Sequence, residues 1–406
     1  MSEPLAARDE QEVADIVAAA CAARRTLEIV GAGSRRGLGR PAVADAVLSV
    51  GALCGVTLYE PEELVLSARC GTPRRDIEAL LAEHGQMLAF EPMDTAPLLG
   101  GPAPGEAGGG TLGGLLAVNL SGPRRLSAGA ARDHVLGMRA VSGRGEAFKA
   151  GGRVVKNVTG YDLPRLNAGA FGTLGVLTEI TLKVLPRPET EETLVVPGVA
   201  AERAGAALAA AMGAPCEVSG AAYVPAPVAA RLPSLPAGDA VLLRLEGVRP
   251  SVLARRALLL QALAPFGAGP VLEAGASAPL WREVRDARPF AAPRHAVVWR
   301  LSTAPMAGPP LAAQLARTLG GEAYCDWAGG LIWLALPGEA ARAEAVRAAL
   351  APHGGHATLL RASVAERAAA PVFQPLPPAL AALTRRVKAS FDPAGVLNPG
   401  RMHADI

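Results

Sequence analysis

Short hydrophobic segments with the period of a β-strand recur along the first 190 residues. Clear examples occupy residues 26–30, 46–50, 55–59, 63–71 and 176–184. In the last of these, alternation places Ile180, Leu182 and Val184 on one face. Two more strands, 135–142 and 146–150, flank the turn Gly143-Arg144-Gly145 and predict a hairpin. The first part of the chain is therefore rich in strands.

Amphipathic helical segments lie between these strands. Residues 9–25 have the spacing of a helix, and so do residues 72–85, where we expect Thr72 as N-cap and Pro73 at the first helical position. A third helix should begin after Thr111. Helices and strands in this order predict the α+β class.

The pattern changes near residue 189, where Leu185-Pro-Arg-Pro188 and the acidic segment ETEE follow the last strand. Beyond this point Ala-rich helical segments (201–212, 250–264, 338–352) alternate with strands such as 240–247 and 329–337. We therefore expect a first domain of residues 1–188 and a second α+β domain of residues 189–385. The C-terminal segment, 386–406, should form a short helix and a compact bend at Asn398-Pro-Gly400.

Three glycine-rich clusters carry the candidate chemistry, and the first is GAGSRRGLGR, directly after the strand 26–30. Gly31, Gly33, Gly37 and Gly39 would let backbone N–H groups surround a phosphate. The spacing is one residue longer than the Rossmann fingerprint, and no long helix clearly follows. A nicotinamide site is therefore disfavoured, and an ordinary turn explains this loop, taken alone, equally well.

The second cluster, AGGGTLGGLLAVNLSGPRR, joins a flexible loop to the helix that Thr111 caps. Gly113 and Gly114 in its first turn each cost about 1 kcal/mol relative to alanine. Close approach of a planar ring would compensate for this cost, and packing of the helix on a sheet is the alternative. Ser121-Gly122 and the arginines that follow would contact the edge of such a ring, or lie in solvent.

The third cluster lies in RVVKNVTGYDLPRLNAGAFGTLGVLTEITLKVLP, where Lys156 precedes Gly169, Gly172 and Gly175. We expect this loop to present backbone amides to a ligand before it enters the strand 176–184. Three such clusters within about 150 residues, each at a strand end or a helix start, indicate a flat, anionic cofactor. FAD is the cofactor that fits this description best.

Composition and charge exclude several other classes of protein. The 40 basic and 37 acidic residues give a net charge of +3 without long runs, unlike a nucleic-acid-binding protein. The five dispersed cysteines form no zinc or iron–sulfur motif, so we expect no metal and a reducing compartment. The N-terminus has acidic residues where a signal peptide is basic, so we expect the cytosol.

Several longer segments carry a family resemblance: YEPEELVLSARCGTP, TLGGLLAVNLSGPRR, VVKNVTGYDLPRLNAGAFGTLGVLTEITLKVLPRP, GGHATLLRA and FDPAGVLNPGRM. With these segments the chain resembles the vanillyl-alcohol oxidase and p-cresol methylhydroxylase (PCMH) superfamily of FAD proteins, and within it the GlcE-type FAD-binding subunits of bacterial glycolate oxidase. The resemblance implies an α+β fold: a two-subdomain PCMH-type FAD domain over 1–188, a cap domain over 189–385, and a tail over 386–406 that packs back on the FAD domain.

The resemblance also assigns roles to the three clusters. It implies that the first contacts the pyrophosphate, that the second lies along the isoalloxazine and ribityl, and that the third closes around the adenine side or the flavin edge. The residues implied are Gly31, Ala32, Gly33 and Ser34; then Thr111, Gly113, Gly114, Ser121 and Gly122; and then Gly172, Thr173, Gly175 and Val176. Lys156, or the helix after Thr111, would stabilise the charge of reduced flavin. Residues 31–41 lack the histidine that links a covalent flavin in relatives, so we expect non-covalent FAD.

The function that the resemblance implies is that of a flavoprotein subunit of a glycolate oxidase complex. Such a subunit relays electrons from the oxidation of glycolate or D-lactate. The expected partners are a related FAD subunit that carries the substrate base and an iron–sulfur subunit, through which the chain would associate peripherally with the membrane.

Two other functions stay open at this point. One is a self-sufficient FAD oxidase or dehydrogenase, with Arg285 of L-W-x-x-R holding the substrate carboxylate, although an ordinary helix explains Arg285 equally well. The other is a scaffold subunit without FAD.

Overall fold

The structure is a computed structural model, and it describes residues 3–100, 109–155, 160–267 and 269–405. The chain divides into two compact units, each of which is described by itself. The first unit comprises Met1–Ser121, Ala130–Arg187 and Pro375–Ile406, and the second comprises Gly122–Gly129 and Pro188–Gln374. Among the described residues, no helix is long and apolar enough to cross a membrane.

A small parallel sheet forms one part of the first unit. Its strand order is β1 (Leu5–Ala6), β3 (Ala46–Ser49) and β2 (Leu27–Val30). Helix α1 (Glu10–Ala23) begins after Asp9, whose carboxylate accepts a hydrogen bond from the backbone N–H of Glu12 (2.8 Å). The C-terminal segment contributes to the same core, because Leu27 forms a parallel bridge to Leu397.

A five-stranded antiparallel sheet forms the other part of this unit. Its strand order is β4 (Val56–Glu60), β5 (Val65–Arg69), β9 (Val176–Lys183), β7 (Val135–Val141) and β8 (Ala147–Gly151). The central strand β9 is mostly buried, and its half-buried positions are the charged residues Glu179 and Lys183. Helices α2 (Arg74–Glu83) and α4 (Leu112–Val118) contribute Ile77, Leu81, Leu112 and Leu116 to the core of this sheet.

The start of α2 differs from the sequence prediction. Pro73, not Thr72, is the N-cap of α2. The Thr72 hydroxyl donates to the backbone oxygen of Arg69 (2.6 Å) and accepts from the N–H of Gly55 (3.0 Å). It therefore fastens the turn before the helix instead of capping the helix.

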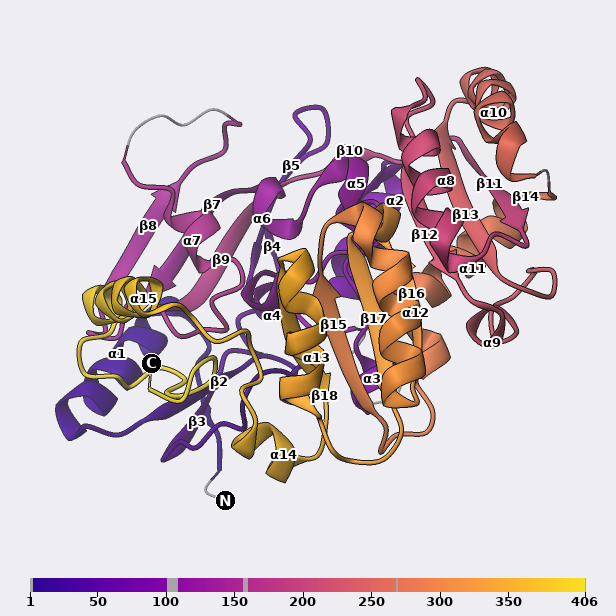
Figure 1. Ribbon diagram of the computed structural model, residues 1–406. Coiled ribbons are helices and arrows are strands. Elements are labelled where there is room, and N and C mark those ends of the chain that lie inside the picture. The colour runs from indigo at the N-terminus through magenta and orange to yellow at the C-terminus, as the bar shows by residue number, and fades with distance from the viewer. Residues whose placement is uncertain (1–2, 101–108, 156–159, 268, 406) are drawn as a thin grey trace. The chain divides into compact units, whose positions relative to one another are not determined.

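The second unit is built on one eight-stranded sheet (Figure 1). Its strand order is β14 (Val271–Glu273), β11 (Thr190–Pro197), β13 (Ala240–Gly247), β12 (Gly220–Val224), β16 (Glu322–Asp326), β17 (Leu331–Leu336), β15 (Val297–Ser302) and β18 (His356–Arg361). One face carries the apolar core with the helices α8 (Ala201–Gly213), α10 (Arg249–Leu263), α12 (Gly308–Leu319) and α13 (Ala343–Leu350). Alternate residues of each strand therefore lie on the opposite face.

Two predictions for this unit were wrong in detail. The acidic ETEE segment does not interrupt the regular structure, because it begins β11, which pairs with both β13 and β14. Arg256 donates to Glu192 (3.0 Å) and compensates its charge, and the Ser277 hydroxyl donates to Glu191 (2.7 Å). The helix expected over 338–352 is shorter, since α13 begins only after Arg342, which has a left-handed backbone conformation.

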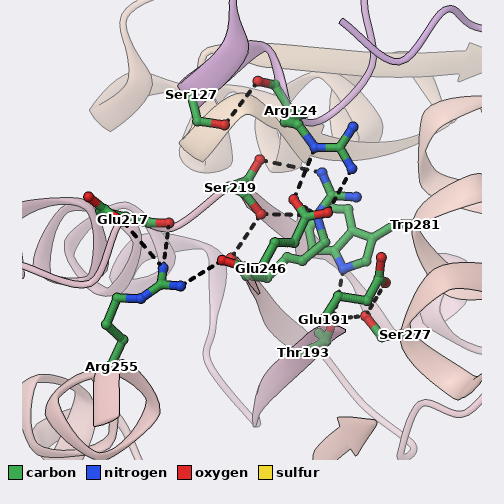
Figure 2. A network of polar contacts seen from close by, with 11 residues as sticks. Arg124, Ser127, Glu191, Thr193, Glu217, Ser219, Glu246, Arg255, Ser277 and Trp281 are labelled. Atoms are coloured by element: carbon green, nitrogen blue, oxygen red, sulfur yellow. Dashed lines mark hydrogen bonds and ion pairs between the residues drawn. The ribbon is translucent and has the colours of Figure 1, made fainter. Parts of the chain in front are cut away.

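The opposite face of the sheet carries a buried polar network, which Figure 2 shows from close by. Glu246 on β13 accepts two hydrogen bonds from Arg124, at 3.0 and 2.6 Å, and its carboxylate lies 3.3 Å from Arg244. Arg255 donates to the backbone oxygen of Glu246 (2.6 Å). Because Arg124 lies in the segment Gly122–Gly129, this ion pair fastens that segment to the second unit.

Candidate functional site

Two adjoining hollows in the first unit bring the glycine clusters together, and we call them the glycine trough. Both hollows are lined by Ile29, Gly31, Thr111, Gly114, Ala117, Phe171 and Asn398. The first continues along residues 32–36 to Arg401. The second continues past Cys70 and Gly113 to Gly172 and Gly175. Segments from six places in the sequence therefore form one continuous surface.

The first glycine loop follows β2, and several of its backbone amides make no hydrogen bond to the backbone. Within the described part of the chain, the N–H groups of residues 32–35 donate to no other backbone group, whereas Arg36 and Leu38 close turns onto Gly33 and Arg35. Gly33 has φ +71°, a conformation that favours glycine. Consecutive unused amides of this kind form an anion-binding concavity.

Arg401 binds backbone carbonyls of this loop. Its guanidinium donates to the backbone oxygens of Arg40 (3.0 Å), Arg36 (3.0 Å) and Arg35 (3.3 Å), and its own backbone oxygen accepts from the N–H of Arg40 (2.9 Å). Arg401 is only 7% exposed. These hydrogen bonds fix the backbone of the loop at residues 35, 36 and 40.

Asn398 joins three of the segments that form the trough. Its side-chain oxygen accepts from the N–H of Ile29 (2.9 Å), and its side-chain nitrogen donates to the carbonyl of Phe171 (2.7 Å). Its backbone N–H donates to the carbonyl of Leu27 (2.9 Å). A Cβ atom on Gly172 would lie 2.7 Å from this amide nitrogen, so only glycine fits beside it. The bend predicted at 398–400 thus fixes the wall of the trough.

Two buried arginines, Arg35 and Arg74, lie beside the second glycine cluster. Arg35 donates to the carbonyl of Gly109 (3.0 Å), and Arg74 donates to that of Pro92 (2.8 Å). The Nε atoms of both are buried without a hydrogen-bond partner among the described residues. Burial, with the like charge of Arg74, lowers the pKa of Arg35 to about 10, against the opposing effect of Asp94. An anion beside Arg35 would relieve both costs.

These arginines also explain two glycines of the second cluster. A Cβ atom on Gly109 would lie 2.5 Å from the guanidinium of Arg74, and one on Gly110 would lie 2.0 Å from that of Arg35. Both glycines have positive φ. These two positions are therefore glycine because arginine side chains pack against them, a reason that the sequence pattern did not indicate.

Helix α4 carries the two adjacent glycines of the second cluster, and each position requires glycine for a different reason. A Cβ atom on Gly113 would lie 2.8 Å from the Cβ of Cys70, so this glycine permits close packing of the helix on β5. A Cβ atom on Gly114 would enter the trough, 3.3 Å from Arg35. As predicted, Thr111 is the N-cap, and its hydroxyl accepts from the N–H of Gly114 (3.4 Å). Helix packing thus explains the glycine at 113, and the open wall of the trough explains the glycine at 114.

The third cluster does not present its amides as the sequence led us to expect. The N–H groups of Gly169 and Phe171 donate to the carbonyls of Leu116 and Ala117 (both 2.9 Å), in the last turn of α4. The N–H of Thr173 donates to Ala170. These amides satisfy the end of a helix. Of the glycines in this cluster, 172 and 175 line the trough, together with Phe171.

Five of the other candidate residues lie in different surroundings. Ser121 is 7% exposed, and its hydroxyl has no hydrogen-bond partner among the residues described. Gly122 belongs to the second unit, where its carbonyl accepts from Trp327 (3.0 Å). Thr173 is held by hydrogen bonds to Ala170 and Lys388, and Val176 is part of the core. Lys156 lies outside the described residues.

Arg285, the candidate for holding a substrate carboxylate, faces a protein carboxylate instead. Its Nε and Nη2 atoms donate to the two oxygens of Asp286, at 2.7 and 2.9 Å. This carboxylate is 3% exposed. The guanidinium is therefore already bound in a two-point pair.

Sequence reasoning missed Arg35, Arg74, Asn398 and Arg401. A signal existed for two of them, because Arg35 is inside the first glycine loop and Asn398 is inside the predicted bend. For Arg74 and Arg401 no local pattern indicates a contact with segments so distant in the chain.

The comparisons with known proteins agree with this arrangement. Residues 5–151 match the family described as FAD binding domain. The chain is 37% identical over 384 residues to glycolate oxidase subunit GlcE of Escherichia coli (strain K12), with 94% of this chain and 93% of that protein covered. It is 43% identical over 94 residues to glycolate oxidase subunit GlcD of Bacillus subtilis (strain 168), which covers 23% of this chain and 20% of that protein.

A solved structure of p-cresol methylhydroxylase with substrate bound shares the fold. Its TM-score is 0.72 at 13% identity, and the match covers 99% of this chain and 88% of that one. The α+β fold of the PCMH type expected from the sequence is thereby confirmed. With the extensive identity to GlcE, these findings show that the chain belongs to the family of GlcE-type glycolate oxidase subunits, which are FAD-linked 2-hydroxy acid oxidoreductases.

Proposed function

We propose that the glycine trough binds FAD without a covalent bond and that the chain acts as a flavoprotein subunit of a glycolate oxidase complex. The observation that carries the proposal is the set of unused amides at residues 32–35, next to the buried guanidinium of Arg35. Both features favour an anion, and the diphosphate of FAD supplies one.

The residues of the trough have distinct roles in this proposal. The amides of Ala32, Gly33 and Ser34 bind the diphosphate, and Thr111, Gly113 and Gly114 leave an open wall beside the ring system. Gly31, Gly172 and Gly175 line the remaining surface. Bound FAD supplies hydride and single-electron transfer. Roles for Ser121, Gly122, Lys156, Thr173 and Val176 stay predictions from the sequence.

Non-covalent binding is supported by the side chains present. No histidine or tyrosine is among the described residues that line the trough, and burial raises the pKa of the Cys70 thiol well above its usual range. A protonated thiol is a poor nucleophile. We expect acid precipitation of the purified yellow chain to release all of its flavin into the supernatant. Flavin that stays with the pellet would contradict this mode of binding.

Replacing Arg35 by methionine should separate a ligand contact from a structural role. We expect the FAD dissociation constant to rise about tenfold, since a hydrogen bond to a charged group contributes about 1.5 kcal/mol or more. The melting temperature of the apoprotein should not fall, because the repulsion between Arg35 and Arg74 is removed. Fluorescence titration and thermal scans measure the two quantities.

The control for Arg35→Met is Arg75→Met, on the exposed side of α2. It should leave both quantities unchanged. A variant Arg35→Met with unchanged FAD affinity would exclude a contact between Arg35 and the cofactor.

The partners in the proposed complex are a GlcD-type FAD subunit and an iron–sulfur subunit. Similarity to both GlcE and GlcD supports a shared origin of two flavin subunits. Co-purification from the native host, with flavin and iron counted per complex, tests this composition. A yellow chain that glycolate reduces by itself would instead support a self-sufficient oxidase, and a colourless chain would support a scaffold.

A further inference from the structure

The C-terminal helix α15 (Pro378–Phe391) of the first unit is docked by a charged side chain (Figure 1). All residues of α15 are described, and Lys388 is the one among them that is buried, with 7% of its surface exposed. Leu380 and Leu383 of the same helix are 47% and 52% exposed. Helices are usually held on a domain by a buried apolar face. The position of α15 therefore depends largely on what the ammonium group of Lys388 contacts.

The ammonium group of Lys388 uses all three of its N–H donors. Two of them donate to the backbone oxygens of Thr173 (2.7 Å) and Leu397 (2.8 Å), and the third donates to a carboxylate one turn further along the chain. Thr173 follows Gly172 in the sequence, and Leu397 precedes Asn398. Gly172 and Asn398 both line the glycine trough. The ammonium group thus joins two segments of the trough wall through residues adjacent to the lining ones.

The carboxylate that accepts the third hydrogen bond belongs to Asp392 (2.6 Å), whose side chain is fully buried. It also accepts from the backbone N–H groups of Val396 (3.0 Å) and Leu397 (2.8 Å). A Cβ atom on Gly143 would lie 2.3 Å from this carboxylate, so glycine is required beside it. The ion pair therefore fixes the backbone at residues 396 and 397 as well as the helix.

The burial of this ion pair favours a role in geometry over a role in stability. Burial lowers the pKa of Lys388, against the opposing effect of Asp392. An apolar pair of similar volume is often as stabilising as a buried ion pair, or more so. An apolar pair has no direction, however, whereas hydrogen bonds set both the distance and the angle between the groups that they join.

We propose that Lys388 is a positioning residue of the cofactor site and that FAD binding is thermodynamically linked to the docking of α15. This rests on the proposed function, because it requires that the trough binds FAD. Asn398 connects Ile29 to Phe171 across the trough wall, and Lys388 sets the separation of the segments that continue from this wall. Linkage is reciprocal, so bound FAD holds α15 in place as strongly as docked α15 favours FAD.

The first test compares the FAD affinity of apoproteins by fluorescence titration. Lys388→Met keeps a side chain of similar length and removes the three donors, so we expect the FAD dissociation constant to rise at least about tenfold. The matched control is Thr181→Val on β9, which removes a buried hydrogen bond to Ser67 (2.8 Å) within the same unit. Thr181 is not among the described residues that line the trough. The control should lose stability and keep wild-type FAD affinity.

Hydrogen exchange of the full chain provides a readout that a purely structural role of Lys388 would not change. Residues 384–392 are not among the described residues that line the trough, so linkage is the route by which FAD slows their exchange. We expect saturating FAD to slow exchange of these amides about fivefold or more in the wild type and in Thr181→Val. In Lys388→Met it should leave their exchange unchanged. The wild-type measurement tests the linkage even if Lys388→Met does not fold.

The outcomes separate this inference from the function on which it rests. Wild-type FAD affinity in Lys388→Met, or exchange at residues 384–392 that FAD does not slow in the wild type, would overturn the inference and leave the proposed function intact. An equal loss of FAD affinity in Thr181→Val would show that lost stability is the cause, which also overturns positioning by Lys388. A wild-type chain that binds no FAD would refute the proposed function and the inference with it.

Discussion

Replacing Arg401 by methionine is expected to weaken FAD binding by about 100-fold or more. The substitution removes the guanidinium that donates to the backbone oxygens of Arg36 and Arg40, and it removes one of the two donors to the oxygen of Arg35, which also accepts from Leu38. Each lost hydrogen bond of this kind costs about 1–3 kcal/mol, and 1.4 kcal/mol corresponds to a factor of ten in affinity. Titration of the apoprotein with FAD, followed by flavin fluorescence, measures the effect.

A matched control for Arg401→Met lies in the same C-terminal segment. Arg385→Met removes an exposed ion pair with Asp405 and should leave FAD affinity unchanged. Arg401→Lys keeps the charge but reaches fewer of the carbonyls, so we expect an intermediate affinity. If Arg401→Met folds and binds FAD as the wild type does, the loop does not depend on Arg401 for its conformation.

The second large effect is expected at Glu246, in the network of Figure 2. Burial alone would raise the pKa of its carboxyl, but Arg244, Arg124 and Ser219 together lower it to about 2. A carboxyl with a lowered pKa stabilises the folded state fully above the pKa of the unfolded chain, 4.5. This stabilisation is lost as the pH falls from about 4.5 to about 2, and its size is about 3 kcal/mol.

Glu246→Gln should therefore lose about 3 kcal/mol of unfolding free energy at pH 7 and show a flatter dependence on pH below 4.5. All four tryptophans lie in the second unit, so their fluorescence during denaturation reports on this unit. Equal stability of variant and wild type at pH 7 would contradict the assignment.

Glu191→Gln is the control within the same network. Burial raises the pKa of Glu191, so its ionised form disfavours folding above the unfolded pKa, and this penalty disappears as the pH falls. The variant should lose no stability at pH 7, although its neighbour Ser277 keeps only a neutral acceptor. The same chemical substitution is thus expected to reduce stability at Glu246 and not at Glu191.

The local elements of the first unit could be predicted from the sequence because their causes are local. Alternation predicted β9, and it is one of the most buried strands. The spacing of apolar residues indicated α1, and Thr111 marked the start of α4. The strand β11 was missed because acidic residues are compatible with a strand only when arginines from other segments neutralise them, as Arg256 does for Glu192.

The sequence by itself determined the fold class, the family and the positions of the glycine clusters, since periodicity, glycine and motif spacing are local properties. The tertiary structure decided what each glycine is for: Gly113 permits packing on Cys70, Gly110 admits Arg35, and Gly172 makes room for Asn398. It also decided which arginines line the trough, as Arg35 does, and which are paired with a protein carboxylate, as Arg285 is with Asp286. The physical reason is that burial and electrostatic pairing depend on groups that are distant in the chain and meet only in the folded protein.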